Sequence, residues 1–396
     1  MKRLLLLCAV LFAWLNVAQA GGFQIPEMGV KAMGMGNAFT AVADDPTANW
    51  YNPAGLGFQK GAAVTVGVLG VMPTVDFNAN NPLSRSAYNA RRQAIFIPHA
   101  YVAIHTNSNL TAGIGINSPF GLEMQWPTNA VFAGATQYGR LRAINVNPNV
   151  AFKLNDNFSV AVGADYVNMY RVDFNGTALR QHFRGDGWGY NVAALYKTDL
   201  FSVGVSYRSS AKITSKGTST TGAPFTVSAA ANSINVSMPD MLNIGVAFHP
   251  TAQWTVSADA DWVNWKKFNQ LAFTYSPSLS IGSSASVPQN WKATWAYRVG
   301  AEWAYSKKMR IRFGYTYDPT PINNTDFTPL IPGNDRQGIH IGYGVSLTDH
   351  ATLDLAYAYF WLTNRQQTQS TGRNVVRNGT YKSSIHLAAV SLTYRF

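Results

Sequence analysis

Long segments in which apolar and polar residues alternate limit what this chain can fold into. At the C-terminal end, Phe396, Tyr394 and Leu392 fall on one face of an extended chain, and Arg395 and Thr393 fall on the other. Successive side chains of a β-strand point to opposite faces, so each such segment predicts a strand with one apolar and one polar side. The same pattern recurs at 158–166, 201–207, 254–262, 295–305, 311–317, 339–347 and 353–361.

Alternation alone also fits a soluble β-sandwich, but further features favour a wall that faces lipid. The segments run to about ten residues, which is longer than most strands of globular proteins. Trp and Tyr stand at the ends of the apolar faces, as at Trp254 and Trp262, where the aromatic girdles of membrane barrels meet the headgroups. Only 13% of the residues are charged, and no segment after the N-terminus is a continuous apolar run of transmembrane-helix length. We therefore predict an all-β transmembrane protein.

The connections between these segments alternate in length. Short turns at 106–109, 155–157, 198–199, 249–251, 306–308 and 348–350 separate longer stretches near 76–92, 119–138, 216–233, 276–290, 321–335 and 366–379. Outer-membrane barrels combine short periplasmic turns with long external loops in this way. Counting the segments predicts a transmembrane antiparallel β-barrel of about 14 strands, an even number as in other bacterial barrels.

The N-terminus has the three parts of a secretory signal peptide. Lys2 and Arg3 give a basic start, an apolar run extends from Leu4 to Leu15, and Ala18-Gln19-Ala20 forms a small-x-small cleavage site. The apolar run is too short to span a bilayer. Residues 1–20 are therefore predicted to be a signal peptide that is removed on export.

Composition argues against several classes of function. Cys8, the only cysteine, lies in the signal peptide, so we expect no disulfide and no cysteine metal site in the mature chain. The net charge is +12, but the basic residues are dispersed and the chain is exported, so we expect no nucleic-acid partner. A basic surface suits anionic lipid headgroups, which makes outer-membrane lipid and lipopolysaccharide the expected neighbours.

Residues 21–59 differ from the rest of the chain because they are rich in Gly, Ala and Met and lack strand-like alternation. A barrel of about fourteen strands encloses a lumen that its own side chains cannot fill, and this stretch precedes the first strand. We predict that it forms an N-terminal hatch, or plug, inside a barrel made of residues 60–396. The motif residues of this hatch are Asp44, Asp45, Asn52, Pro53 and Ala54.

Short motifs in a fixed order resemble the FadL family of outer-membrane transporters. The hatch of that family is similar to Gly22-Phe23-Gln24, Gly34-Met35-Gly36-Asn37-Ala38, Ala43-Asp44-Asp45 and Tyr51-Asn52-Pro53-Ala54-Gly55-Leu56. The resemblance extends over the whole chain through Asn117-Ser118-Pro119-Phe120-Gly121-Leu122 and the terminal Phe396. Members of this family carry long-chain fatty acids or aromatic hydrocarbons across the outer membrane of Gram-negative bacteria. The resemblance implies a multi-pass outer-membrane barrel that transports hydrophobic small molecules and is not an enzyme.

The resemblance also implies a route for the cargo. A hydrophobic molecule is captured between external loops, binds in a pocket above the hatch, and leaves sideways through a gap at a kinked third strand. Phe23 is expected at the floor of the pocket. The third strand and the apolar capture loop after it supply the other expected binding residues: Pro119, Phe120, Leu122, Met124, Trp126 and Phe132. The alternative for this loop is that it folds onto a small core of its own.

The third strand, predicted from Leu110 to Pro119, carries the candidates for a sideways exit. An intact ladder of backbone hydrogen bonds leaves no gap between strands, so a lateral route requires a break in the wall. Gly113 and Gly115 lack side chains that would fill a gap, and the neighbouring Pro98 removes a ladder donor. The alternative is that the two glycines only relieve crowding against the hatch.

Several other functions fit parts of the sequence. An outer-membrane lipid enzyme would need a paired nucleophile and base, yet the 7 His residues are scattered and no Gly-x-Ser-x-Gly elbow occurs. A passive porin would not need a Gly-rich plug, and a structural or adhesive barrel is a further alternative. Within the resembled family, uptake of aromatic hydrocarbons is the alternative to uptake of fatty acids. We expect no cofactor and no metal, a monomer, and contact of the C-terminal strand with the barrel assembly machinery.

Overall fold

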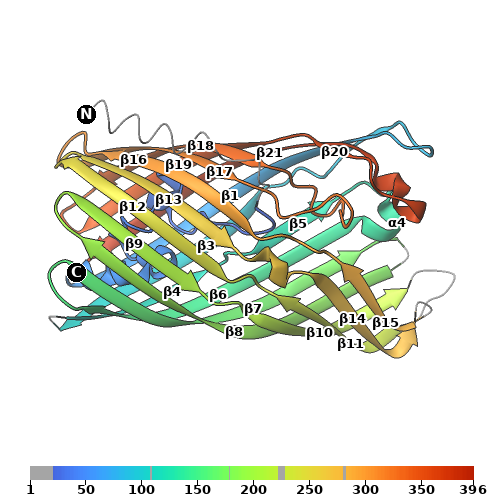
Figure 1. Cartoon of the computed structure of the whole chain (residues 1–396), viewed down its shortest axis with the longest axis horizontal. Coiled ribbons are helices and arrows are strands. Elements are labelled where there is room, and N and C mark those ends of the chain that lie inside the picture. The colour runs from blue at the N-terminus through green and yellow to red at the C-terminus, as the bar shows by residue number, and fades with distance from the viewer. Residues whose placement is uncertain (1–20, 108, 178, 222–227, 280–281) are drawn as a thin grey trace.

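The computed structural model describes residues 21–107, 109–177, 179–221, 228–279 and 282–396, and the predicted signal peptide lies outside them. Within these residues, antiparallel strands form one closed wall around a short, mostly helical N-terminal segment (Figure 1). Strand β1 (Ala62–Ala79) pairs with β21 (Gly379–Arg395) along its length, from Ala63 opposite Arg395 to Ala79 opposite Gly379. Pairing between the first and last strands closes the wall, which confirms the predicted β-barrel.

Fourteen strand positions make up the wall, in agreement with the number predicted from the sequence. Seven of these positions consist of two segments in line: β2 with β3, β4 with β5, β9 with β10, β11 with β12, β13 with β14, β15 with β16, and β19 with β20. The strands after β1 are β2 (Ala87–Asn89), β3 (Ile95–Asn107), β4 (Leu110–Asn117), β5 (Gly121–Gln125), β6 (Tyr138–Lys153), β7 (Phe158–Asn175), β8 (Leu179–Lys197), β9 (Phe201–Arg208), β10 (Lys212–Thr221), β11 (Ser228–Ser237), β12 (Met241–Thr251), β13 (Trp254–Val263), β14 (Gln270–Leu279), β15 (Gly282–Pro288), β16 (Thr294–Trp303), β17 (Met309–Asp318), β18 (Arg336–Ser346), β19 (Ala351–Leu362), β20 (Arg365–Gln367) and β21.

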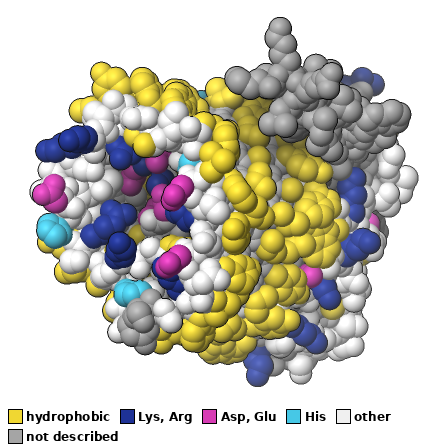
Figure 2. Space-filling view, turned by 60° about the vertical axis from the view of Figure 1, so that its left-hand side comes forward, with side chains coloured by type: hydrophobic (Ala, Val, Ile, Leu, Met, Phe, Trp, Pro, Cys, Tyr) yellow, Lys and Arg dark blue, Asp and Glu magenta, His cyan; other side chains and the backbone are white. Residues whose placement is uncertain are grey.

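The apolar side of each strand points away from the lumen. On β21, Val390, Leu392 and Tyr394 are exposed, whereas Ser391 and Thr393 between them are buried. The strands β18 and β19 repeat this arrangement, and together the outward side chains form the apolar band in Figure 2. Burial in lipid rather than water explains how so much apolar surface can face outward.

Charged and polar side chains fill the inner face of the wall. Arg298 pairs with Asp261 at 2.5 Å, and Arg312 pairs with Asp354 at 2.6 Å, all four side chains being buried. A buried charge is costly unless it has a partner of opposite charge, so these pairs allow the polar faces to line a packed interior.

The segment inside the wall comprises α2 (Val30–Gly34), α3 (Ala48–Tyr51) and the 3₁₀-helix η1 (Pro53–Phe58). Its backbone is held by wall side chains: the Asp259 carboxylate accepts hydrogen bonds from the Phe39 and Thr40 amides at 2.9 and 2.8 Å, and the Ser257 hydroxyl donates to the Ala38 carbonyl at 2.7 Å. The short helices outside it are α4 (Ala133–Thr136), η2 (Trp265–Lys267) and η3 (Gly372–Arg377). Among the described residues, no helix has the length and hydropathy needed to span a bilayer.

Candidate functional site

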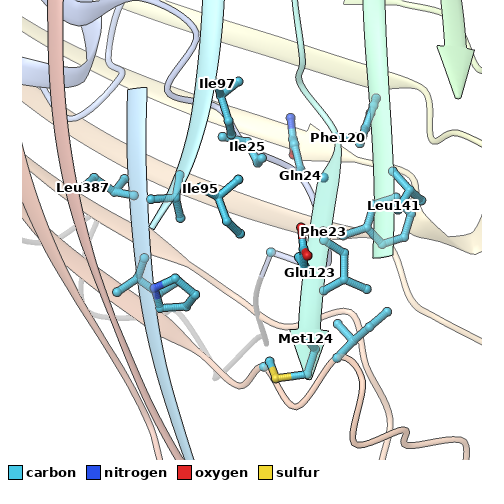
Figure 3. A pocket seen from close by; sticks show the side chains of 18 of the residues that line it. Phe23, Gln24, Ile25, Ile95, Ile97, Phe120, Glu123, Met124, Leu141 and Leu387 are labelled. Carbon is cyan, nitrogen blue, oxygen red and sulfur yellow. The ribbon is translucent and has the colours of Figure 1, made fainter. Parts of the chain in front are cut away.

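A cavity of about 540 Å³ lies between the hatch and the long external loops. Its lining comes from the start of the hatch, from β1, β3, β5, β6 and β21, and from the loop that precedes β18. Figure 3 shows Ile95, Ile97 and Leu387 on one side of this space and Phe120 and Leu141 on the other. The cavity falls within the roughly 300–1,000 Å³ of typical small-molecule sites, and its mostly apolar lining suits an apolar ligand.

The wall is interrupted beside the cavity. The ladder between β3 and β4 ends where Ala100 pairs with Ile116, and β5 pairs only with β6. Residues 118–120 lie between β4 and β5 and belong to no strand. The third wall position is therefore broken at the height of the cavity.

Residues of the hatch occupy the free edge at this interruption. The Ile25 amide donates to the Pro119 carbonyl at 2.8 Å, and the Gly121 amide donates to the Phe23 carbonyl at 3.0 Å. Gln24 and Phe120 thereby form an isolated antiparallel bridge. The first residues of the hatch thus replace, over one short stretch, the strand partner that the wall lacks.

The cavity lining continues to the outer surface of the barrel at the same place. Phe96 and Tyr170 both line the cavity, yet their side chains are 71% and 47% exposed on the lipid-facing side. Pro98, which follows Phe96 on β3, also lines it. The cavity is therefore bounded at this point by the interrupted strand and the hatch segment, not by a complete ladder.

Phe23 and Phe120 line the cavity, and further aromatic rings pack against Phe23. The Phe23 ring centroid lies 6.1 Å from Phe120, 4.9 Å from Trp265, 5.2 Å from Phe268 and 5.7 Å from Trp291. Most of these pairs meet edge to face, an arrangement that aromatic rings prefer. Trp265, Phe268 and Trp291 lie far from the hatch in sequence, and no pattern in the sequence had marked them.

The residues predicted to bind the cargo separate into two groups. Phe23, Phe120, Leu122 and Met124 line the cavity, and Pro119 adjoins it through its backbone bond to the hatch.

The other two residues, Trp126 and Phe132, do not line the cavity. They pack with Phe77, 6.3 and 5.3 Å from its ring centroid, and the Trp126 indole donates to the Pro329 carbonyl at 2.9 Å. The second half of the loop thus packs into a core that it shares with β1, β21 and the loop that contains Pro329.

The glycines predicted at the lateral opening lie below the interruption, in the paired part of β4. A Cβ atom on Gly113 would come within 2.6 Å of both Asn49 and Leu56 of the hatch, and one on Gly115 would lie 2.8 Å from the Tyr101 ring. Gly113 permits close packing of the wall against the hatch. Their part in lateral release stays a prediction, whereas Pro98 lies at the cavity itself.

Two polar groups at the base of the cavity were not predicted from the sequence. Arg336, at the start of β18, lines the cavity and forms an ion pair with Asp318, and its guanidinium lies 5.6 Å from the centre of the Phe360 ring. Glu27 of the hatch also lines the cavity and accepts a hydrogen bond from Asn37 at 3.2 Å. Burial raises the pKa of Glu27 above its usual value. Neither the start of a strand nor the hatch marks a charged residue as part of an apolar cavity, so only the folded chain brings these two groups together.

The opposite side of the hatch carries a network of charges. Lys31 of the hatch pairs with Asp44 at 2.7 Å and lies 3.6 Å from Glu302 of the wall. Arg312 bonds to the same Glu302 at 2.6 Å and to Asp354 at 2.6 Å. Figure 2 shows Lys, Arg, Asp and Glu side chains gathered in the hollow at this end of the barrel. The network joins the hatch to β16, β17 and β19.

The pKa values of Asp44 and Asp45, the acidic pair of the hatch motif, are shifted in opposite directions. Burial disfavours the charged form of Asp44, but the Lys31 ammonium outweighs burial and keeps the pKa of Asp44 below its usual value. Burial, and then the neighbouring Asp44 carboxylate, raise the pKa of Asp45 to about 6, while the bonds that Asp45 accepts from Thr47 oppose the rise.

The Asn-Pro-Ala part of the motif ends the hatch. The Asn52 side chain accepts from the Ala54 amide at 3.1 Å and caps the 3₁₀-helix that Pro53 begins. The Asn52 amide group also donates to the Thr40 carbonyl at 2.8 Å and the Ala194 carbonyl at 3.1 Å. One side chain therefore fixes the helix start, the hatch and the wall together.

The closed barrel, the segment folded into its lumen and the apolar cavity above that segment define a plugged membrane barrel for hydrophobic ligands. The sequence of residues 10–396 matches the family described as outer membrane protein transport protein (OMPP1/FadL/TodX). The chain belongs to this family. It is thus an outer-membrane transport protein for hydrophobic substrates rather than an enzyme, which confirms these predictions from the sequence.

Individual relatives resemble the chain over most of its length at low identity. The long-chain fatty acid transport protein of Escherichia coli strain CFT073 is 23% identical over 86% of this chain and 87% of its own. The crystal structure of a Pseudomonas aeruginosa FadL homologue superposes with a TM-score of 0.80 at 19% identity, covering 95% of this chain and all of that one. The Ralstonia pickettii toluene transporter TbuX gives 0.71 at 17% identity, covering 94% and 100%. At these identities the two structures establish a shared fold.

Proposed function

We propose that the protein takes long-chain fatty acids or similar lipophilic molecules from outside the cell and releases them sideways into the membrane. The cargo is captured at the external loops, binds in the cavity above the hatch, and leaves through the interruption between β4 and β5. The observation that supports this route is the junction of three features at residues 118–121: an apolar cavity, a missing strand partner, and a hatch segment that fills the missing place.

Exit toward the periplasm is the less favourable direction. Below the cavity, an apolar molecule would have to pass the buried ion pairs between wall strands and the Lys31–Glu302 pair that joins the hatch to the wall. Removing one partner of a buried pair leaves an uncompensated charge and costs about 3–5 kcal/mol. At the interruption, by contrast, only a few backbone bonds separate the cavity from lipid.

The volume of the cavity favours an acyl chain as the ligand, whereas the aromatic side chains in its lining favour a ligand with an aromatic ring. A cavity of about 540 Å³ can be filled by a long chain, whereas a one-ring hydrocarbon would leave most of it empty. Phe23 and Phe120, however, line the cavity and offer aromatic rings for contact with a planar aromatic molecule. Uptake of aromatic hydrocarbons is therefore the second candidate. The hatch makes a passive porin less suitable, and a lipid enzyme is excluded by the family.

A disulfide across the hatch and the interrupted strand tests the lateral route. Gln24 and Phe120 form a bridge whose flanking amides bond to the opposite chain. In such a non-hydrogen-bonded pair the Cα atoms lie about 4.5 Å apart, within the range that a disulfide spans. We expect the Gln24→Cys/Phe120→Cys variant to take up fatty acid at least tenfold more slowly when oxidised, and to recover on reduction. The same protein before and after reduction is its own control, and equal uptake in both states would contradict the lateral route.

Arg336 is the proposed contact for the carboxylate of a fatty acid. A charge-assisted hydrogen bond contributes about 1.5–3 kcal/mol, so we expect Arg336→Gln to weaken fatty acid binding by roughly 10- to 100-fold. Binding of the matching uncharged alkane should change little, which makes the alkane the control ligand. Each additional buried methylene contributes about 0.8 kcal/mol, so affinity should rise with chain length in both proteins. Equal losses for acid and alkane would show that Arg336 supports the fold and not the head group.

The apolar outward face of the last strand indicates how the barrel is inserted into the outer membrane. Phe396 is 75% exposed at the end of β21, whose outward face is apolar. We infer that this strand is what the barrel assembly machinery recognises, that the protein works as a monomer, and that lipopolysaccharide surrounds its external half.

A further inference from the structure

Four cations form a row across adjacent strands on the outer surface of the barrel. Arg142 on β6 stands opposite Arg171 on β7, and Arg184 on β8 stands opposite Lys216 on β10. A bulge in β7 places Tyr170 and Arg171 between the pairs Met169–Gly185 and Val172–Phe183, which brings Arg171 opposite Arg184. Neighbouring strands are about 4.8 Å apart, so the row extends for roughly 15 Å. We call Arg142, Arg171, Arg184 and Lys216 the basic row.

Like charges directly opposite each other on a sheet destabilise it. Two carboxylates relieve one half of the row: Glu123 pairs with Arg142 at 2.8 Å, and Asp173 pairs with Arg171 at 2.9 Å. The other half has no such relief, since the ion pairs formed among the described residues include neither Arg184 nor Lys216. Both side chains are exposed. Asp186, exposed on the same face two residues from Arg184, forms no ion pair with either cation within the described residues, so an anion bound from outside the protein would relieve the repulsion.

The position of the row along the barrel axis indicates which anions can reach it. Below it on β8, toward the periplasmic end, the outward residues are Asp186 and then two aromatic residues: Trp188 and Tyr190 are 64% and 54% exposed, and the Trp188 ring packs 4.9 Å from Tyr166. Such a girdle marks the boundary between the apolar core and the headgroups. Beyond the apolar band, Lys and Arg side chains appear on the surface toward the external end in Figure 2. The basic row therefore lies at the headgroups of the outer leaflet.

We propose that the basic row is a binding site for the phosphate groups of the outer-leaflet glycolipid, with Arg184 and Lys216 as its central contacts. Guanidinium and ammonium groups both bind phosphate, and the guanidinium does so with two parallel hydrogen bonds. The row has the length of a disaccharide headgroup that carries a phosphate at each end. The proposal does not depend on which cargo the cavity takes, because Arg184 and Lys216 do not line the cavity, although Arg142 at the other end of the row does.

The test compares Arg184→Gln/Lys216→Gln with a matched double variant at the periplasmic end, Lys307→Gln/Lys308→Gln, whose side chains are also exposed. Purified barrels in non-ionic detergent with EDTA are titrated with bisphosphorylated lipopolysaccharide, and the melting temperature reports binding. Each cation near an anionic headgroup changes affinity by about fivefold. We therefore expect roughly 30-fold weaker binding for the first variant and unchanged binding for the second.

Two further measurements separate a lipid site from a structural role. Without lipid, Arg184→Gln/Lys216→Gln should melt at the same temperature as the parent or higher, because the repulsion is gone, whereas with lipopolysaccharide it should melt lower. A lower melting temperature under both conditions would overturn the proposal. Dephosphorylated lipopolysaccharide should bind the parent as weakly as the intact lipid binds the variant. Equal stabilisation by inorganic pyrophosphate would mean that free phosphate, not lipid, occupies the row, and would also overturn it.

Discussion

The two sides of the hatch differ in chemistry although the same strands surround both. On the external side the lumen contains an apolar cavity lined by Phe23, whose ring packs on Trp265. On the periplasmic side Lys31, Glu302 and Arg312 bind the hatch to the wall through charges. An apolar molecule gains free energy by entering the first region and loses it by entering the second. The difference shows that a barrel can offer a ligand a site without offering it a path through the lumen.

The hatch is also held differently on its two sides. Toward the periplasm it is fixed by side-chain ion pairs and by wall groups bonded to its backbone, such as Asp259 to Phe39 and Thr40. Toward the cavity its first residues are held by a few backbone bonds to residues 119–121 and by the packing of Phe23 among aromatic rings, without an ion pair to the wall in the described residues. Few bonds and an adjoining cavity are the features of a segment that opens locally. We expect the lower hatch to stay fixed while the segment around Gln24 moves.

Removing the hatch should have the largest effect, because it removes both the base of the apolar cavity and the charged network on the periplasmic side. Without residues 21–59, the barrel encloses a lumen that its side chains cannot fill, and water and ions would enter it. We expect planar-bilayer conductance to rise from near zero to a value of the size seen for open porins. Heat-modifiable migration on a gel would establish that the shortened barrel is folded. A folded barrel with unchanged, near-zero conductance would mean that the hatch does not seal the lumen.

The wall could be predicted from the sequence because the alternation that specifies a strand also specifies its two faces. The exposed Leu392 and Tyr394 and the buried Ser391 and Thr393 are read directly from their spacing. The place where a ladder ends has no comparable signal. Residues 118–120 were identified only as part of a resemblance, and nothing in their order says that hatch residues pair with them.

The cavity lining was only partly predictable for a related reason. Leu122 and Trp126 belong to one apolar loop, yet the first faces the cavity and the second is buried in the core that the loop shares with β1 and β21. Both environments select the same residue types, so composition does not separate them. Arg336 and Trp265 reach the site from other strands and loops through long-range contacts, which no local pattern records.

A smaller effect is expected where the wall packs against the lower hatch. A Cβ atom on Gly113 would lie 2.6 Å from Asn49 and Leu56, so Gly113→Ala should destabilise the barrel by about 1–3 kcal/mol through overpacking. Ligand binding and uptake should fall together. Gly134 is the matched control, because a Cβ there would meet nothing within 4 Å. Slower uptake with normal binding and normal melting temperature would instead support a lateral opening at Gly113.

The smallest effect concerns the acidic pair of the hatch and depends on pH. In the folded protein burial and Asp44 raise the pKa of Asp45 to about 6, above its ordinary value of 3.8. Between these two values the folded state binds more protons than the unfolded state, so stability falls as the pH rises through this interval. Above about pH 6 the cost of the buried charge is fully present, with an upper bound of about 3 kcal/mol.

Asp45→Asn removes that cost and keeps the oxygen that accepts from the Thr47 amide and hydroxyl. The neutral acceptor forms weaker bonds, which offsets part of the gain, so we expect a net stabilisation of about 1 kcal/mol at pH 7.5. Melting temperatures of both proteins from pH 4 to 8 measure this, and the difference should shrink or reverse toward pH 4, where Asp45 is protonated in the parent as well. Asp44→Asn is the contrasting variant: it removes the ion pair with Lys31 and should destabilise the hatch at pH 7.5. If Asp45→Asn is equally destabilising at every pH, the buried charge of Asp45 does not lower the stability of the folded protein at high pH. Asp44 and Asp45 would then both stabilise the periplasmic side of the hatch.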